Sequence, residues 1–312
     1  MTVYFLQVVT ALSAVTLFFQ QVVNGLSLGA IYALIALGYT MVYGTLQMIN
    51  FAHSEVFMMG GFFALILAKA TGVADNPTLA GVAFVSVATM VSCALLGAAI
   101  ERLAYRPMRK SGRLNLLITA IGMSLLLQNS ALLYWGTNVP FPDLLPRTSW
   151  NVAGVTISSN NLLVFGVTIA LMVALHHVVE RTQMGRAMRA VAVSRDAAAL
   201  MGIPVDRVIA FTFALGSALA GAASMLWVID NPRVDPFMGT MPGLKAFVAA
   251  VLGGIGSIPG AVAGAILLGL CETMVSGYVS STWRDAVAFL LLIVILLYRP
   301  AGLLGKHVPE KV

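Results

Sequence analysis

Charged residues are scarce in this sequence. Only 10% of its 312 residues are Asp, Glu, Lys or Arg, whereas 59% are hydrophobic. A nucleic-acid-binding protein presents many basic residues on a solvated face, and the 18 Lys and Arg residues here are scattered between long apolar runs. The mean hydropathy of +0.93 lies outside the range of soluble proteins. The composition therefore predicts a protein of the lipid bilayer.

The sequence also lacks the motifs of common catalytic and metal sites. Its two cysteines, Cys93 and Cys271, lie in apolar segments without a CxxC partner or a nearby histidine, so we expect no zinc or redox site. There is no HExxH motif and no evident carboxylate pair, which makes an intramembrane enzyme the weakest hypothesis. No G-x4-G-K-S/T motif occurs, so we expect no nucleotide site and no cofactor on this chain.

Long apolar runs dominate what is present. A membrane-spanning helix needs about 20 mostly apolar residues, because roughly 30 Å of hydrocarbon is divided by 1.5 Å per residue. We read such spans at 4–23, 25–44, 54–70, 78–100, 114–135, 161–179, 207–229 and 286–298. The sequence therefore predicts an all-α, polytopic inner-membrane helical bundle of about eight transmembrane helices, forming one domain over residues 1–312.

A glycine-rich break interrupts the apolar segment 244–277. Gly253, Gly254, Gly256 and Gly260, together with Pro259, cannot continue a helix. The roughly ten residues before the break span about 15 Å, half the hydrocarbon thickness. We therefore expect a half-helix that returns to its side of entry, with the break facing protein or a wet cavity. The alternative is a tight loop between helices at the surface.

Basic residues set the expected orientation. Thirteen of the 18 Lys and Arg residues fall in three segments, 101–113, 180–207 and the tail from Arg299. The positive-inside rule places these segments in the cytoplasm. Alternation of the predicted spans then puts both the N-terminus and the C-terminus on the cytoplasmic side of the bacterial inner membrane, if the broken hairpin enters and leaves on the outer side.

The loop 180–207 contains residues that typically begin and end two short helices. Thr182 is suited to cap the first and Ser194 the second, with Asp196 in a first turn where the helix dipole favours an anion. Gly202 fits the position just after the second helix, and Pro204 follows where a helix has stopped. A helix of about two turns is marginal alone in water, so we expect it to bind a partner.

Parts of the sequence resemble known transport proteins. Asp196-Ala197-Ala198, followed by Gly202, resembles the EAA-x3-G loop of ABC-importer permeases, with Asp in place of Glu. Longer stretches closely resemble the branched-chain amino-acid permease family of LivH type, and the matches extend from about residue 22 to about residue 302. They are Asn24–Leu34 (NGLSLGAIYAL), Gly38–Gly44 (GYTMVYG), Ile49–Glu55 (INFAHSE), Gly185–Ala190 (GRAMRA) and Ala250–Gly260 (AVLGGIGSIPG).

This resemblance implies a permease subunit of an ABC importer for branched-chain amino acids. The implied partners are a second, LivM-like permease, two ATPase subunits of LivG and LivF type, and a periplasmic amino-acid-binding protein. We expect the loop to dock on an ATPase subunit, and the alternative is a solvated basic loop that serves only topology. The residues expected to carry this coupling are Arg186, Arg189, Ser194, Arg195, Asp196, Ala197, Ala198 and Gly202.

Charged residues inside the membrane are functional candidates because their insertion is costly. Glu55 and Glu272 qualify, and Asn50 and His53 cluster with Glu55. We name these four residues, with the glycines of the break, as candidates for a translocation pathway or gate: Asn50, His53, Glu55, Gly253, Gly254, Gly256 and Glu272. Two structural alternatives stand beside this. Asn50 or Ser54 can cap the next helix, with Glu55 complementing its dipole, and Glu272 can pair with Arg284.

Other functions fit the sequence less well. Members resembling this family also serve urea or short amides, so the substrate stays open. An ion-coupled secondary transporter is a further alternative, but it would normally show two related halves and a charge relay inside the bundle. Whether transport requires ATP and ATPase subunits distinguishes the two classes.

Overall fold

The computed structural model describes residues 2–48, 50–109, 111–299 and 301–305, with side chains from residue 14 onward except at Arg113. Of the basic residues counted above, Lys110, Lys306 and Lys311 lie outside the described residues.

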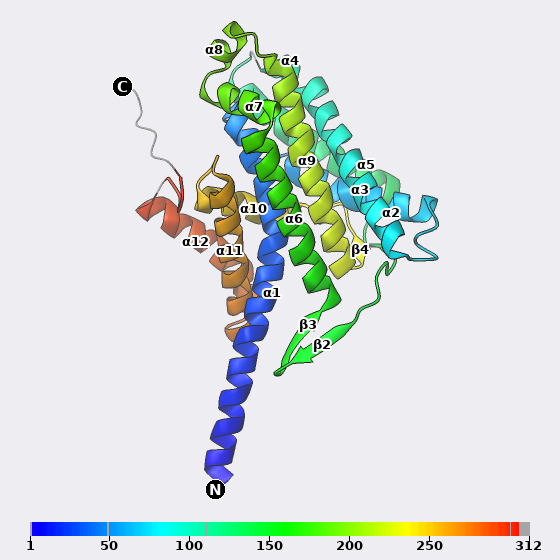
Figure 1. Cartoon of the computed structure of the whole chain (residues 1–312), viewed down its shortest axis with the longest axis vertical. Helices are drawn as coiled ribbons and strands as arrows, with labels where there is room; N and C mark the ends of the chain where they lie inside the picture. Colours follow the sequence, from blue (N-terminus) through cyan, green and yellow to red (C-terminus); the bar gives the residue numbers. More distant parts are fainter. Residues whose placement is uncertain (1, 49, 110, 300, 306–312) are drawn as a thin grey trace.

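Helices make up most of the described chain (Figure 1). In chain order the elements are α1 Thr2–Leu46, α2 His53–Ala70, α3 Leu79–Ile100, the π-helical turn η1 Glu101–Tyr105, α4 Arg106–Met108, α5 Arg113–Trp135, β1 Val139–Pro140, β2 Ser149–Val152, β3 Val155–Ser158, α6 Ser159–Arg181, α7 Gln183–Val193, α8 Arg195–Leu200, α9 Val205–Asp230, β4 Arg233–Val234, α10 Thr240–Gly253, α11 Ile258–Tyr278, the 3₁₀ turn η2 Ser281–Trp283 and α12 Arg284–Tyr298. The strands form two small antiparallel pairs, β1 with β4 and β2 with β3.

Eight helices of the described chain are long and apolar enough to cross a membrane, which confirms the predicted polytopic bundle. The candidate spans are Ala14–Leu46, His53–Ala70, Leu79–Met108, Leu114–Trp135, Ser159–Arg181, Val205–Asp230, Ile258–Tyr278 and Ser281–Tyr298. The count agrees with the sequence-based expectation, but two of its members differ.

The first difference is α1, which is one helix where we expected separate spans at 4–23 and 25–44. Polar side chains lie where the two expected spans would meet, and the structure gives them partners. Gln20 bonds to Asn24 one turn on, and it exchanges two hydrogen bonds with the backbone of Thr156 in β3, at 2.8 and 3.1 Å. Gly25, one residue later, packs directly against Leu270 and Thr273 of α11. Polar groups with partners do not need a helix boundary.

Because α1 is one helix, the position of its first residues also differs from the one expected. Gln20, within α1, meets β3, and the C-terminal end of α1, at Leu46, meets Arg195 of α8. The helix therefore runs the whole way from the strands to the α7–α8 end of the molecule, and it begins on the far side from α7 and α8 (Figure 1). We expected the N-terminus on the same side as loop 180–207; the described course of α1 runs against this, and the orientation in the membrane stays a prediction. The positive-inside rule could not orient this segment directly, because residues 1–52 contain no charged residue.

The second difference is the broken segment. Its first arm, α10, has 14 residues and is too short to cross, as predicted, but its second arm, α11, is a full-length helix of 21 residues. Between them Gly254 and Gly256 have positive φ angles of 105° and 92°, which favour glycine. After α12 the chain returns to this break, where the N–H groups of Leu303 and Leu304 donate to Leu252 and Gly253. The break is thus covered by protein at Gly253 and Gly254.

The first arm of this hairpin begins next to the strands, and the second arm packs beside it. β4, just before α10, pairs with β1, and Lys245 near the start of α10 pairs with Glu272 near the end of α11. The hairpin therefore enters and leaves on one side, the side opposite α7 and α8.

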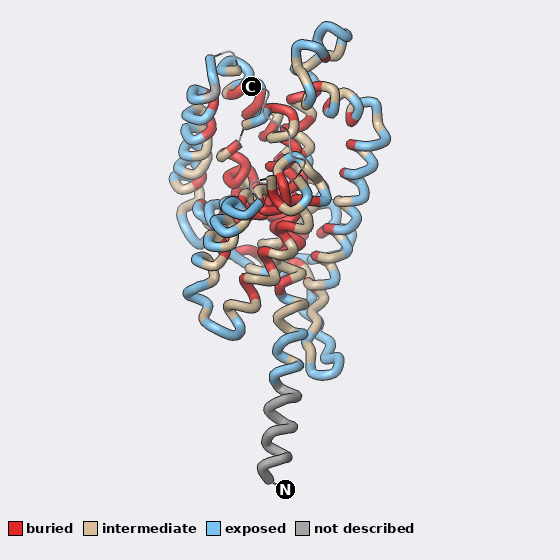
Figure 2. Tube along the Cα trace, turned by 90° about the vertical axis from the view of Figure 1, so that its left-hand side faces the viewer, coloured by how far each residue is buried: buried red, intermediate tan, exposed pale blue. Residues whose placement is uncertain are grey.

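The core lies around α1, α2 and α9, where Figure 2 shows the buried residues gathered at the centre of the bundle. Close helix crossings use small residues. A Cβ at Gly216 of α9 would lie 3.3 Å from the Cα of Gly38 in α1, and Gly221 packs against Cys93 of α3. The small-residue faces of α9 are therefore helix contacts, as in many membrane proteins. Cys93 is buried in the core.

Candidate functional site: the α7–α8 surface and the buried polar groups

The two short helices of loop 180–207 form as the capping pattern predicts. The Thr182 hydroxyl accepts a hydrogen bond from the Gly185 N–H at 3.1 Å, and the Ser194 hydroxyl accepts from the Ala197 N–H at 3.2 Å. Gly202 takes a φ of 79°, and its N–H and that of Ile203 donate back to the last turn of α8. Local rules acting within a few residues therefore suffice to build α7 and α8.

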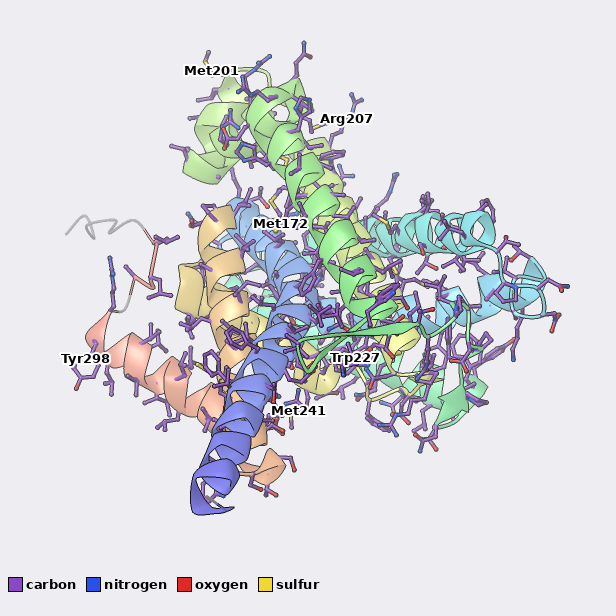
Figure 3. The ribbon with its side chains drawn as sticks, turned by 60° about the horizontal axis from the view of Figure 1, so that its bottom comes forward. Met172, Met201, Arg207, Trp227, Met241 and Tyr298 are labelled. Carbon is purple, nitrogen blue, oxygen red and sulfur yellow. The ribbon has the colours of Figure 1, made fainter. Side chains whose placement is uncertain are left out.

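The far side of these helices presents an apolar tip. Val193, Leu200 and Met201 are 87%, 88% and 83% exposed, whereas Ala198 turns inward and is buried. In Figure 3 Met201 lies at the extreme end of the molecule, near Arg207. We call Val193, Leu200 and Met201 the α8 tip. Three large apolar side chains at an exposed extremity are what a docking contact needs.

Arg195 connects α8 to the end of α1. Its guanidinium donates to the carbonyl oxygen of Thr45 at 3.3 Å and to that of Leu46. Carbonyls in the last turn of a helix have no partner within the helix, so a basic side chain there satisfies them and complements the dipole. Burial lowers the pKa of Arg195 and Asp196 partly offsets this, but an arginine stays charged. We expected Arg195 to contact a partner protein, and the structure gives it an internal role.

Arg189 also works within the chain. It pairs with Glu180 at 3.3 Å and donates to the carbonyl oxygen of Val179, which holds α7 against the end of α6. Arg186 is exposed as well. Arg189 therefore makes internal contacts while part of its side chain stays accessible.

A second ionic cluster lies beside α8. Arg109 pairs with Asp206 at 2.8 Å and with buried Glu101, and Arg106 pairs with the same Asp206. Burial lowers the pKa of Arg109, and Asp206 partly restores it. The cluster ties the end of α3 to the start of α9, across a cavity of about 870 Å³ that also borders Ala199 and Gly202. Sequence reasoning used these arginines only for topology and missed the cluster.

The polar residues before and within α2 point to three different places. Asn50 accepts from the Ala52 N–H at 3.1 Å and from the Tyr105 hydroxyl, so it fixes the turn that precedes α2. His53 is buried with its ring 4.7 Å from that of Tyr39 and against Gly38, inside the core. Glu55 faces α5, where its Oε1 accepts from the Ser124 hydroxyl at 3.2 Å. The three residues therefore do not form one site.

Helix capping, the structural alternative for Asn50, Ser54 and Glu55, accounts for only part of their contacts. The N-cap of α2 is Ala52, which makes no side-chain cap bond, and the Ser54 hydroxyl donates to the Phe51 carbonyl rather than accepting from the helix. Glu55 lies in the first turn of α2, where a carboxylate complements the dipole.

Glu272 is the centre of a buried ionic cluster. Its Oε2 lies 3.0 Å from Lys245 Nζ, 3.0 Å from Arg284 Nε and 3.3 Å from the Tyr32 hydroxyl. Lys245 also pairs with Asp285 at 2.6 Å. The expected pair with Arg284 is present, and Lys245 was missed because it lies 27 positions away in the sequence.

Cavities flank this cluster at the strand side of the molecule. One of about 470 Å³ lies between α1, α6, α9 and α11, and one of about 610 Å³ reaches Lys245 and Asp285. Both border Trp227, Asn231 and Arg284. The glycines of the break lie elsewhere, since Gly253 follows Lys245 by eight residues, roughly 12 Å of helix.

Comparison with known proteins decides the family. The model described as "Branched-chain amino acid transport system / permease component" matches residues 21–296. The chain belongs to this family. It is 44% identical over 304 residues to the high-affinity branched-chain amino acid transport system permease protein LivH of Escherichia coli K12, covering 95% of this chain and 98% of that protein. It is 45% identical over 305 residues, with the same coverage, to the permease protein BraD of the corresponding Pseudomonas aeruginosa system.

More distant similarity reaches the ribose import permease protein RbsC of Escherichia coli K12, at 28% identity over 257 residues, 79% of this chain and 74% of that protein. No solved structure matches the chain. As a member of the branched-chain amino acid permease family with eight apolar helices, the chain is a multi-pass membrane protein, and its relatives are transport permeases.

The candidate site residues of this permease lie at three separate places in the bundle. The α8 tip lies at one end of the bundle, the Glu272 cluster lies towards the other, and Glu55 lies at an inner face between them. Among the described residues no three His, Cys, Asp or Glu side chains are grouped to hold a metal ion.

Proposed function

We propose that this chain is the membrane-spanning permease subunit of an ATP-driven importer for branched-chain amino acids in the bacterial inner membrane. Its proposed partners are a second permease, two cytoplasmic ATPase subunits that hold ATP and Mg²⁺, and a periplasmic binding protein that delivers the substrate. The high identity to LivH and BraD along almost the whole chain supports this assignment.

One observation supports the proposed coupling between the ATPase subunits and the permease. The exposed α8 tip and the inward Arg195 belong to the same short segment, so a force on the tip reaches the end of α1 through the guanidinium–carbonyl bonds. From there α1 packs along α11 and α9 through its glycines. Closure of the ATPase dimer would displace α8 and thereby favour one of two permease states, which requires different contacts in each state.

Gly202 offers the sharpest test of this coupling. Its φ of 79° disfavours any side chain, and it lies directly behind α8, so Gly202→Arg disturbs the docking surface without touching the membrane core. We expect ATP hydrolysis stimulated by the binding protein to be lost in the reconstituted complex, while the permease still inserts and assembles.

A matched control is Gly72→Arg. Gly72 has a comparable φ of 71°, has open space around it, and lies in the turn after α2, far from α8. We expect stimulated ATP hydrolysis to persist in this variant. Normal stimulation in Gly202→Arg, or equal loss in both variants, would refute docking through α8.

A further inference from the structure

A cavity of about 300 Å³ lies where α1, α2, α5 and α10 meet. Most of its lining is apolar, and its polar groups are few and close together. The apolar residues are Tyr39, Phe51, Ile121, Leu125, Leu244 and Phe247, and the polar ones are Ser54, Glu55, Ser124 and Thr240. Small-molecule sites have this size and character: an apolar wall with a few placed polar groups that fix orientation.

Glu55 is the one charged residue in that lining. Its side chain is 3% exposed, and its Oε1 accepts from the hydroxyls of Ser124 at 3.2 Å and Ser54 at 3.5 Å. Its Oε2 is buried and has no hydrogen-bond partner among the described residues. A buried carboxylate without a cation is costly, and natural sites retain one mainly where it serves a ligand.

The cavity has firm walls. Gly239 and Gly243, at the start of α10, press so closely on Ser54 that a Cβ at either position would collide with it. Gln128 of α5 donates to the Thr240 hydroxyl at 3.3 Å, which fixes α5 against α10. These contacts hold Glu55 opposite the apolar face of Leu244 and Phe247.

The open side of the cavity lies between α5 and α10, where Ile121 and Leu125 are exposed. Lipid tails carry no hydrogen-bond donor and cannot satisfy Oε2 of Glu55. A polar group at such a place in a membrane protein faces a water-filled path rather than lipid.

We propose that this cavity receives the transported amino acid, with Oε2 of Glu55 accepting hydrogen bonds from its ammonium group and the apolar wall receiving its branched side chain. This inference rests on the proposed function and adds the place where the chain meets its substrate. An ammonium group has three donors, and its hydrogen bonds to a carboxylate are charge-assisted and strong. No Lys or Arg lines the cavity, so it offers no counter-charge to a lone carboxylate ligand.

Three probes with the same branched carbon chain test this recognition. L-leucine carries both charged groups, 3-methylbutylamine carries only the ammonium, and 4-methylpentanoate carries only the carboxylate. Binding is measured by calorimetry on the assembled permease–ATPase complex in nanodiscs, without binding protein. We expect the first two probes to bind and 4-methylpentanoate not to bind.

Glu55→Gln should weaken binding of the two ammonium probes roughly tenfold or more, because a charge-assisted bond becomes a neutral one. Ser124→Ala leaves the charge in place and should change binding much less. Equal binding of 4-methylpentanoate, or unchanged binding in Glu55→Gln, would overturn the proposal.

Two neighbouring leucines on α5 provide a matched pair for the apolar wall. Leu125 lines the cavity and is 53% exposed, whereas Leu126 does not line it and is 59% exposed. In the complete importer, Leu125→Trp should reduce uptake of L-leucine more than uptake of the smaller L-valine, and Leu126→Trp should reduce neither. The same loss for both substrates, or in both variants, contradicts a substrate cavity.

The proposed function and the assignment of the cavity are contradicted by different results. If uptake by the wild-type complex does not depend on ATP, the proposed function is wrong. If uptake depends on ATP while Glu55→Gln and Leu125→Trp behave as the wild type does, only the cavity assignment is wrong.

Discussion

Glu55 and Glu272 are both acidic residues buried within apolar helices, and their surroundings differ sharply. Glu272 has two cations and a hydroxyl on one oxygen, drawn from α1, α10 and α12. Glu55 has hydroxyl donors on one oxygen and no cation, and in both residues the other carboxylate oxygen has no hydrogen-bond partner among the described residues. A carboxylate whose charge is matched inside the chain fixes helices to one another, whereas one left without a cation remains available to a ligand. The same residue type thus has a structural role in one place and a proposed binding role in the other.

The largest effect should follow from removing the matched carboxylate. Glu272→Leu leaves Lys245 and Arg284 without their shared partner at a buried site, and breaking a buried ion pair costs about 3–5 kcal/mol. We expect a clear fall in the unfolding temperature of the purified complex, measured by loss of the assembled peak in size-exclusion chromatography after heating. A variant as stable as the wild type would show that the cluster does not hold α10, α11 and α12 together.

A smaller effect should follow from Tyr32→Phe. This change removes one neutral donor from Glu272 but leaves both cations, so we expect a destabilisation of about 1 kcal/mol or less. The same heating assay measures it. A loss as large as that of Glu272→Leu would mean that the hydroxyl, rather than the cations, sustains the cluster.

The smallest effect on stability should come from Glu55→Gln. The amide oxygen still accepts from Ser124, and no cation loses its partner, so we expect a change below about 1 kcal/mol. The comparison becomes sharp when this small change in the unfolding temperature accompanies a large loss of ammonium binding. A destabilisation equal to that of Glu272→Leu would make Glu55 a structural residue and end the contrast.

Sequence reasoning succeeded where the rules act over a few residues. The caps at Thr182 and Ser194, the positive φ of Gly202 and the short α10 before its glycine break all follow from local backbone chemistry. Apolar length predicted the six spans of α2, α3, α5, α6, α9 and α12, and the total of eight agrees only because α1 was counted twice and α11 was left out.

It failed where partners come from far along the chain. Arg195 bonds to carbonyls about 150 positions away, and Lys245 meets Glu272 through the fold of the α10–α11 hairpin. The sequence analysis expected two spans where α1 is one helix, and the partners that Gln20 has in β3 could not be read from the sequence. No rule of spacing reveals such contacts.

The central claim is that this permease opens only when an ATPase drives it through α8. The direct measurement is the accumulation of leucine in proteoliposomes that contain both permeases, with the binding protein either inside or outside the vesicles. Accumulation is compared with and without the ATPase subunits and ATP, while a proton or sodium gradient is imposed. The account predicts accumulation only when the ATPase subunits and ATP are both present, and its loss in Gly202→Arg. Accumulation of leucine against its gradient by the permeases alone would contradict it.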